Sequence, residues 1–253
     1  MSLEGKLALV TGGGRGIGKA IAERLALDGA RVVVTGRTQA EIDEVASAIG
    51  GIALRMDVAD RGAIAAGLEE LKERGLHVDV LVNNAGASES APFERTSDEL
   101  WDRMLAVNVT SAFALCRALI PPMIHKGFGR VINIASNAGL TGYAYTTAYC
   151  ASKHAMVGMT RSIALEIARH PVTINCVCPG WVKTRMAEEA ASRISKKTGR
   201  DAAEATRALE AMSPQRRMVE PSEVAHVTAM LCSHEARGIH GQAIPVDGGQ
   251  VMS

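Results

Sequence analysis

The chain has 253 residues, with 28 Lys and Arg against 27 Asp and Glu, so its formal net charge is +1. This balance excludes a strongly electrostatic binder of nucleic acid and a polybasic protein of the membrane surface. A hydrophobic content of 47% with 22% charged residues is typical of a packed globular domain. Five cysteines form an odd set without framework spacing, which argues against a disulfide-stabilised secreted domain.

The N-terminal region has no cationic start followed by a long apolar run, and no apolar stretch reaches the roughly 18 residues of a membrane span. We therefore expect a cytoplasmic protein whose partner is a small molecule, not nucleic acid or a membrane. The histidines show no paired ligand spacing, and Cys176 and Cys178 alternate along a predicted strand. No metal site is indicated.

Short apolar runs alternate with longer amphipathic segments along the whole chain. The runs predict strands at 7–11, 31–35, 53–56, 80–82, 130–135, 172–177 and 242–246. The segments between them predict helices at 17–27, 40–49, 64–74, 98–124, 148–169 and 221–233. Continuous apolar strands joined by helices indicate a parallel sheet buried on both faces. We predict one α/β domain, residues 1–253, with a Rossmann-type doubly wound sheet of seven strands.

One segment, residues 183–217, interrupts this alternation. It is rich in Ala and charge, and it predicts two helices, 186–194 and 201–212, around Thr198 and Gly199. It is either a surface insertion or a substrate lid. The lid hypothesis follows from its position, because it leaves the carboxyl end of the sixth strand, where open α/β sheets bind ligands.

A glycine-rich turn follows the first predicted strand and opens the first helix. Gly12, Gly16 and Gly18 have the spacing G-x-x-x-G-x-G, not G-x-G-x-x-G. Glycines allow close approach of the backbone to a ligand, and the helix N-terminus offers free N–H groups to a pyrophosphate. Between a strand and a helix, this turn predicts a dinucleotide site.

The end of the second strand indicates which dinucleotide binds. A carboxylate there would bind a ribose 2′-hydroxyl, but the chain has Gly36 followed by Arg37. Arg15, inside the glycine-rich turn, can point at the same place, and two guanidinium groups suit a 2′-phosphate. We predict NADP(H) as the preferred cofactor, with NAD(H) possible if both arginines are merely solvated.

Tyr149 and Lys153 lie four residues apart, on one face of a predicted helix. An adjacent ammonium group can lower the pKa of a phenol towards neutrality, where it exchanges protons with a substrate oxygen. The pair alone could equally be an exposed helix face. Ser136, Asn83–Asn84–Ala85–Gly86 and Pro179–Gly180, however, each follow a strand at the ligand-binding edge of the sheet, where Ser136 can donate to the same oxygen.

These motifs, in this order, resemble the short-chain dehydrogenase/reductase family across essentially the whole chain. The resemblance implies that Tyr149 is the catalytic acid/base, that Ser136 polarises the substrate oxygen, and that Lys153 lowers the Tyr149 pKa and binds the nicotinamide ribose. It implies that Asn108 supports a water in the proton relay. The dinucleotide-binding residues that it implies, together with those named above, are Gly12, Arg15, Gly16, Ile17, Gly18, Arg37, Asp57, Val58, Asn84, Ala85, Gly86, Tyr149, Lys153, Pro179, Gly180, Val182 and Thr184.

Several of these residues have a simpler structural interpretation. Asn108 could bond a neighbouring carbonyl group, Asp57 could cap the helix that follows it, and Asn83 could tie strands together. By the same resemblance the assembly is a homotetramer that uses the helices at 98–124 and 148–169, although both could be buried within one chain.

The substrate is the least defined part of the prediction. The expected lining is mixed apolar and aromatic, with Ser136, Asn137, Tyr143, Tyr145, Trp181 and Met186 as candidates beside Ser88 and Glu89. The segment 149–186 most resembles β-ketoacyl and polyketide ketoreductases. Lys126, Arg130 and Arg169 are available for a carrier protein, but Gly127 and His170 occupy positions where fatty-acid members have arginines.

We therefore predict an NADP(H)-dependent oxidoreductase that interconverts a ketone and a secondary alcohol, with a β-ketoacyl-type or a small or cyclic ketone as substrate. The alternatives are an NAD-dependent hydroxyacyl or cyclic alcohol dehydrogenase and an epimerase or dehydratase on the same scaffold. A non-catalytic nucleotide sensor is disfavoured, because it has no use for Ser136, Tyr149 and Lys153 together.

Overall fold

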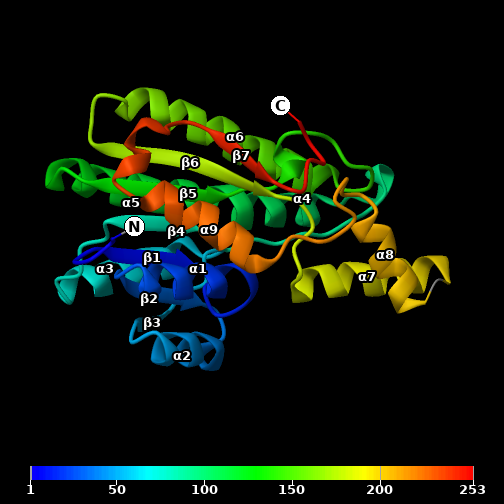
Figure 1. Cartoon of the computed structure of the whole chain (residues 1–253), viewed down its shortest axis with the longest axis horizontal. Coiled ribbons are helices and arrows are strands. Elements are labelled where there is room, and N and C mark those ends of the chain that lie inside the picture. The colour runs from blue at the N-terminus through cyan, green and yellow to red at the C-terminus, as the bar shows by residue number, and fades with distance from the viewer. Residues whose placement is uncertain (1, 200, 253) are drawn as a thin grey trace.

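The computed structural model describes residues 2–199 and 201–252, which fold around one seven-stranded parallel sheet (Figure 1). The strands are β1 Leu7–Thr11, β2 Arg31–Gly36, β3 Ile52–Arg55, β4 Val80–Asn83, β5 Gly129–Ile134, β6 Val172–Pro179 and β7 Ala243–Val246. Their order is β3-β2-β1-β4-β5-β6-β7, which confirms the predicted Rossmann-type sheet. Met1, Arg200 and Ser253, which the predicted domain includes, lie outside the described residues.

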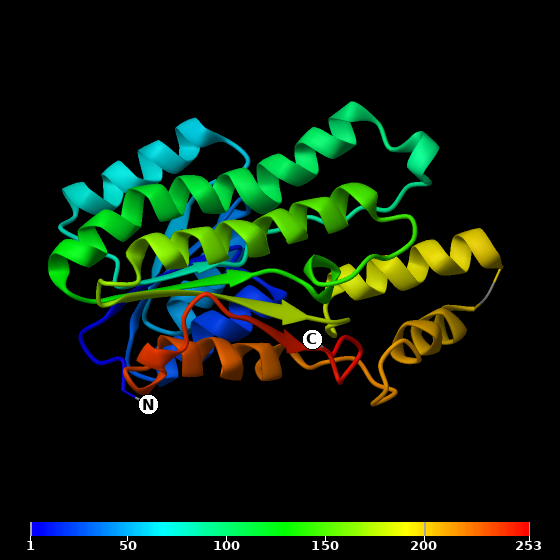
Figure 2. The same ribbon diagram turned by 90° about the horizontal axis from the view of Figure 1, so that it is seen from above.

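Helices cover both faces of the sheet (Figure 2). One face carries α1 Gly16–Leu27, α2 Gln39–Ala48 and α9 Pro221–Cys232, and the other carries α3 Arg61–Glu73, α5 Ser111–Lys126 and α6 Thr147–Ile167. Every residue of β1, β4, β5 and β6 is buried, as expected for strands covered on both faces. The strands all run in one direction, so their carboxyl ends share one edge, and most of the residues selected by the sequence analysis follow the strands at that edge.

The long helix predicted at 98–124 is interrupted. It consists of α4 Asp98–Leu105, a π-helical turn η2 Ala106–Thr110, and α5. One 18-residue window of the combined helix 98–126 has the length and composition of a membrane span, contrary to the sequence-based expectation. In this fold, Leu115, Cys116 and Met123 of α5 instead belong to the core that packs against the sheet.

The segment predicted as an insertion or lid forms two helices, α7 Arg185–Thr198 and α8 Ala202–Glu210, which project from one end of the sheet (Figures 1 and 2). Their apolar residues form a separate cluster that includes Ala187, Ala190 and Leu209. At the base of this helical hairpin, Val182 pairs with Val219 in an isolated bridge. Two backbone hydrogen bonds close the bridge, from Lys183 N to Val219 O (2.9 Å) and from Val219 N to Trp181 O (2.8 Å).

Candidate active site

The glycine-rich turn between β1 and α1 is shaped by contacts that leave no room for side chains. Gly12 has a φ of +62°, which favours glycine, and a Cβ built on it would lie 3.0 Å from the Cα of Ala85. A Cβ on Gly18 would lie 2.2 Å from the carbonyl oxygen of Gly12. The N-terminus of α1 has no side-chain cap, so its N–H groups remain available to a ligand. These features fit the pyrophosphate of a dinucleotide.

Asn84 and Ala85 hold this turn in place from the end of β4. The Asn84 side-chain amide donates to the carbonyl oxygens of Thr11 (2.9 Å) and Gly12 (3.2 Å). The backbone N–H groups of Asn84 and Ala85 both donate to the Thr11 hydroxyl, at 3.0 Å each. Asn83 does not contact this turn through its side chain. Its amide donates to Asn133 Oδ1 at 2.8 Å and so links β4 to β5, in agreement with the simpler structural role considered for it.

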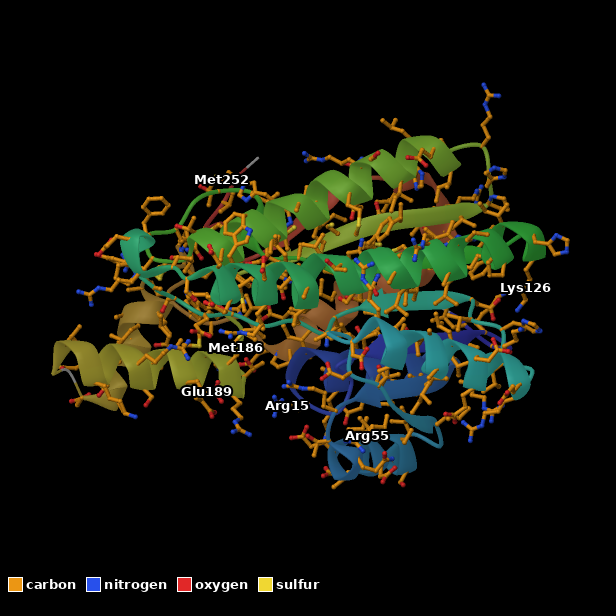
Figure 3. All side chains as sticks on the ribbon, turned by 180° about the vertical axis from the view of Figure 1, so that it is seen from behind. Arg15, Arg55, Lys126, Met186, Glu189 and Met252 are labelled. Atoms are coloured by element: carbon orange, nitrogen blue, oxygen red, sulfur yellow. The ribbon has the colours of Figure 1, made fainter. Side chains whose placement is uncertain are left out.

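Basic residues gather at the carboxyl ends of β1, β2 and β3. Arg37 follows β2 and is exposed, and Arg15 extends from the glycine-rich turn towards α7, which carries Met186 and Glu189 (Figure 3). Arg55, at the end of β3, is in register with Gly36 and is a third arginine that the sequence analysis missed. Its position near the end of the third predicted strand, beside the end of the second, was the sequence signal that could have identified it.

Arg15 also has a partner that the sequence analysis did not identify. Its Nη1 lies 3.2 Å from Oε1 of Glu41, in the first turn of α2. Asp57 lies nearby in sequence to Arg55 and accepts a hydrogen bond from Ala59 N at 3.0 Å. The cap of α3 is Asp60, which accepts from Gly62 N at 2.7 Å, so Asp57 is not that cap; Val58 packs in the core.

Lys153 and Tyr149 lie on consecutive turns of α6, beside Ser136 at the end of β5. The Lys153 Nζ donates to the carbonyl oxygen of Ile134 at 2.9 Å and lies 5.8 Å from the centroid of the Tyr149 ring. The Ser136 side chain is close enough to the Tyr149 phenol to lower its pKa, and the Ser136 hydroxyl accepts a hydrogen bond from Ala138 N at 3.1 Å. The structure therefore brings the three predicted catalytic side chains together.

Burial determines the protonation of this group. It raises the pKa of Tyr149 above its ordinary value of 10, an effect that the nearby Ser136 side chain opposes. It lowers the pKa of Lys153 to about 8. The expected lowering of the Tyr149 pKa by Lys153 is not found in the chain alone: desolvation is the largest cause of the shift and raises the pKa, and Ser136 is the group that lowers it.

Asn108 lies in the π-helical turn η2 and is fully buried. Its amide donates to Ala87 O (3.0 Å) and Ser152 Oγ (2.9 Å), while its Oδ1 accepts from Ala87 N (2.9 Å). Asn108 therefore does bond a neighbouring carbonyl group, that of Ala87. Asn108 is also close to Lys153, because a Cβ built on Gly86 would lie 3.2 Å from Asn108 Oδ1 and 3.6 Å from Lys153 Nζ.

The segment after β6 forms the opposite wall. Gly180, after Pro179, packs so closely on Asp247 that a Cβ there would lie 2.8 Å from the Asp247 Cβ. Val182 is buried, and the Thr184 side chain would lie 3.3 Å from a Cβ on Gly16. This wall therefore reaches the glycine-rich turn, whose Ile17 packs against the core.

The predicted substrate residues separate into two groups. Trp181 and Met186 belong to the hairpin: Trp181 Nε1 contacts Met212 Sδ at 3.3 Å, and Met186 is exposed on α7. Tyr145 is 65% exposed and has a φ of +66°, a strained value for a non-glycine residue. Its side chain is therefore a weak candidate for a closed pocket.

Asn137 and Tyr143 face the C-terminal turn. The Asn137 amide donates to Gln250 Oε1 (3.1 Å) and Asp247 Oδ2 (3.4 Å). The Tyr143 hydroxyl is buried, and no described group meets hydrogen-bond geometry with it. Burial raises the pKa of Tyr143, and the nearby Gln250 side chain lowers it by a smaller amount. A cavity of about 460 Å³ lies on this turn, at the base of the hairpin, and none of its lining residues is catalytic.

The basic residues considered for a carrier protein lie elsewhere. Lys126 ends α5, Arg130 is the second residue of β5 and Arg169 precedes β6, all at the edge opposite Ser136. Lys126 binds the buried Asp79 at 2.6 Å, and Arg130 donates to Ser233 O at 3.2 Å. Within one chain they do not border the cleft. No cluster of three potential metal ligands occurs among residues 2–199 and 201–252.

A tight glycine-rich turn and a Ser–Tyr–Lys group at the carboxyl edge of a doubly wound sheet define a dinucleotide-dependent oxidoreductase. A family model described as "Enoyl-(Acyl carrier protein) reductase" matches residues 12–250. The chain is 39% identical to D-beta-hydroxybutyrate dehydrogenase of Cupriavidus necator, over 98% of this chain and 99% of that protein. It is 36% identical to a 3-oxoacyl-[acyl-carrier-protein] reductase of Haemophilus influenzae, over 99% and 100%.

The structure is also similar to a variant of actinorhodin polyketide ketoreductase solved with NADPH. The TM-score is 0.94 at 36% identity, covering 99% of both chains. The chain belongs to the short-chain dehydrogenase/reductase family, and within it to the ketoreductase type. It is an oxidoreductase that acts on CH–OH groups.

Proposed function

We propose that this enzyme is an NADP(H)-dependent ketoreductase, with a β-ketoacyl-type or a small or cyclic ketone as substrate. The arrangement of Ser136 and the Tyr149 phenol beside the Lys153 ammonium group carries the proposal: Lys153 lies 5.8 Å from the Tyr149 ring and is bonded to Ile134, two residues before Ser136. A hydroxyl and a phenol that share one substrate oxygen can polarise a carbonyl group and give it a proton.

The dinucleotide fits the turn at Gly12, Gly16 and Gly18, and when bound it supplies or accepts the hydride. Tyr149 gives its proton to the carbonyl oxygen in the reduction direction and takes it back in oxidation. Ser136 stabilises the negative charge that develops on that oxygen. Lys153, cationic below a pH of about 8, stabilises the resulting phenolate. Asn108 fixes the segment around Ala87 and Ser152 on which this group is built.

Arg15, Arg37 and Arg55 support the preference for NADP(H). The N-terminus of the ten-residue helix α2 lies directly after Arg37, and Thr38 provides no side-chain cap. Free N–H groups and arginines together suit a 2′-phosphate. Two relatives are named for a β-hydroxy and a 3-oxoacyl compound, and the structural neighbour was solved with NADPH.

The test is a panel of β-ketoacyl coenzyme A thioesters, β-ketoacyl carrier-protein thioesters, cyclic ketones, steroids and sugars, read at the nicotinamide absorbance with both cofactors. We expect NADPH consumption stoichiometric with ketone, and a kcat/KM ratio of NADPH over NADH above unity. A kcat/KM ratio below unity refutes the cofactor preference. If none of the ketones causes NADPH to be consumed, the reaction class is refuted.

The assembly proposed is a homotetramer in the cytoplasm. Trp101, Phe113 and Leu165 are apolar and exposed on the outer faces of α4, α5 and α6. A second copy of the chain would cover them. Light scattering after gel filtration should give four times the chain mass, and cell fractionation should place the protein in the soluble fraction.

A further inference from the structure

The only ion pair at the arginine-rich edge of β1–β3, within the described part of the chain, joins Arg15 to Glu41. Arg37 and Arg55 form no ion pair among the described residues. Glu41 therefore places one negative charge where the proposed 2′-phosphate binds. The two side chains are 55% and 37% exposed, so the pair is accessible to solvent and to a ligand.

The position of Glu41 is fixed by backbone packing, not only by its ion pair. A Cβ built on Gly14, the residue before Arg15, would lie 3.0 Å from the Glu41 Cβ and 3.2 Å from its backbone carbonyl carbon. The first turn of α2 thus rests against the glycine-rich turn. The backbone of Glu41 therefore stays next to the glycine-rich turn that carries Arg15.

We propose that Glu41 is a specificity-determining residue, which weakens binding of the 2′-phosphate and so limits the preference for NADPH over NADH. This inference rests on the proposed dinucleotide site. A phosphate dianion at Arg15 competes with the Glu41 carboxylate for the guanidinium group and is repelled by that carboxylate. NADH carries a neutral 2′-hydroxyl group and meets neither effect.

The chain contains a matched control. One turn further along α2, Glu44 forms a second exposed ion pair, with Lys19 of α1 at 3.3 Å. Glu41→Gln and Glu44→Gln change the net charge equally. Only Glu41 lies beside Arg15, so only Glu41→Gln should change selectivity for the phosphate.

The experiment measures dissociation constants by calorimetry for NADPH, NADH and adenosine 2′,5′-bisphosphate, at low and moderate salt. We expect Glu41→Gln to bind NADPH and the bisphosphate about two- to fivefold more tightly, which is the range for one exposed charge pair, with NADH unchanged. Glu44→Gln should leave all three constants unchanged, and the gain should shrink with added salt.

Weaker or unchanged NADPH binding by Glu41→Gln overturns the inference, since Glu41 would then position Arg15 or do nothing. Equal shifts for NADH, or an equal shift from Glu44→Gln, also overturn it, because the effect would then be one of net charge. The proposed function is tested separately. It is refuted if the unaltered enzyme prefers NADH, whatever the NADPH-to-NADH affinity ratio of Glu41→Gln.

Discussion

The ammonium group of Lys153 donates to the carbonyl oxygen of Ile134, 2.9 Å away, and so joins α6 to the end of β5. Ser136 follows Ile134 by two residues, and Tyr149 precedes Lys153 by one helical turn. This hydrogen bond therefore helps to position Ser136 relative to Tyr149, the two groups that we propose act on one substrate oxygen. The catalytic group depends on strand and helix packing as much as on the identity of its side chains.

Replacing Tyr149 by Phe removes the proton donor and leaves the ring. We expect kcat for ketone reduction to fall by about 10²- to 10⁴-fold, the usual contribution of general acid catalysis. The dissociation constant for NADPH, measured by fluorescence titration, should stay within about twofold, because the glycine-rich turn is untouched. Undiminished turnover by this variant with every ketone would contradict the assignment.

The pKa of about 8 for Lys153 predicts the alkaline limit of the enzyme. As the pH rises through this value the ammonium group loses its charge, and the phenolate formed on Tyr149 loses its stabilising neighbour. We expect kcat/KM for ketone reduction to fall above a pH of about 8. A profile measured at constant ionic strength that stays flat to pH ~10, the reference range for a free lysine, would disprove this role.

The same buried cation affects stability. The folded-state pKa of Lys153, about 8, lies below its ordinary value of 10.5, so between these pH values the unfolded chain binds more protons. Its contribution to the free energy of unfolding therefore rises with pH across that window. Lys153→Met should remove this rise and stabilise the chain at neutral pH by about 1–3 kcal/mol. The measurement is denaturant unfolding of both proteins at pH values near each end of the range from about 8 to 10.5 and at neutral pH. If Lys153→Met is less stable than the unaltered chain at neutral pH, the buried ammonium group is not destabilising.

Gly18→Ala tests the geometry of the glycine-rich turn. The new Cβ would lie 2.2 Å from the Gly12 carbonyl oxygen, so the turn must open, and we expect dinucleotide binding to weaken by at least about 100-fold. Gly158→Ala is the control, since nothing lies within 4 Å of a Cβ at that helical glycine. Calorimetry with NADPH should give an unchanged constant for the control; equal losses in both variants would rule out a specific role for the turn.

Asp247 organises the C-terminal turn beside the active site. Its Oδ1 accepts from Gly249 N (3.1 Å) and Gln250 N (3.2 Å), and its Oδ2 accepts from Val251 N (2.9 Å) and from Asn137. Asp247→Asn replaces one acceptor with a donor, which should destabilise the chain by about 1–3 kcal/mol.

We also expect Asp247→Asn to raise KM for the ketone more than it lowers kcat, because Asn137 loses its anchor. Asp43→Asn, at an exposed site, changes the net charge equally and should change neither quantity. Thermal unfolding and steady-state kinetics on the two variants make the comparison. Identical behaviour of both variants would mean that the turn does not support Asn137.

Local patterns were sufficient to predict most of the fold. Each predicted strand matches an observed one within two residues at either end, because a sheet buried on both faces requires continuous apolar runs. The π-helical turn at Asn108 was not predicted, since it continues the apolar helical pattern on both sides. Its position is set by the bonds of Asn108 to Ala87 and Ser152, which only the folded chain brings together.

The site was predictable by residue type but not by contact. Glycine spacing and the Tyr149–Lys153 pair are short-range signals. The ion pair of Arg15 with Glu41 spans 26 positions, and the contact of Asn137 with Asp247 spans 110. The direction of the Tyr149 pKa shift was also beyond local reasoning, because spacing reveals a neighbouring charge but not the depth of burial.

The hairpin of α7 and α8 joins the domain through the bridge of Val182 with Val219, and its apolar residues pack mainly on one another. The glycine-rich turn is held by contacts with the end of β4 and contributes no residue to that cluster. Mutations confined to that apolar cluster can therefore accumulate without altering Ser136, Tyr149, Lys153 or the glycine-rich turn. New substrate ranges can therefore evolve on this fold through changes in the α7–α8 hairpin, while the strands that carry the glycine-rich turn stay the same.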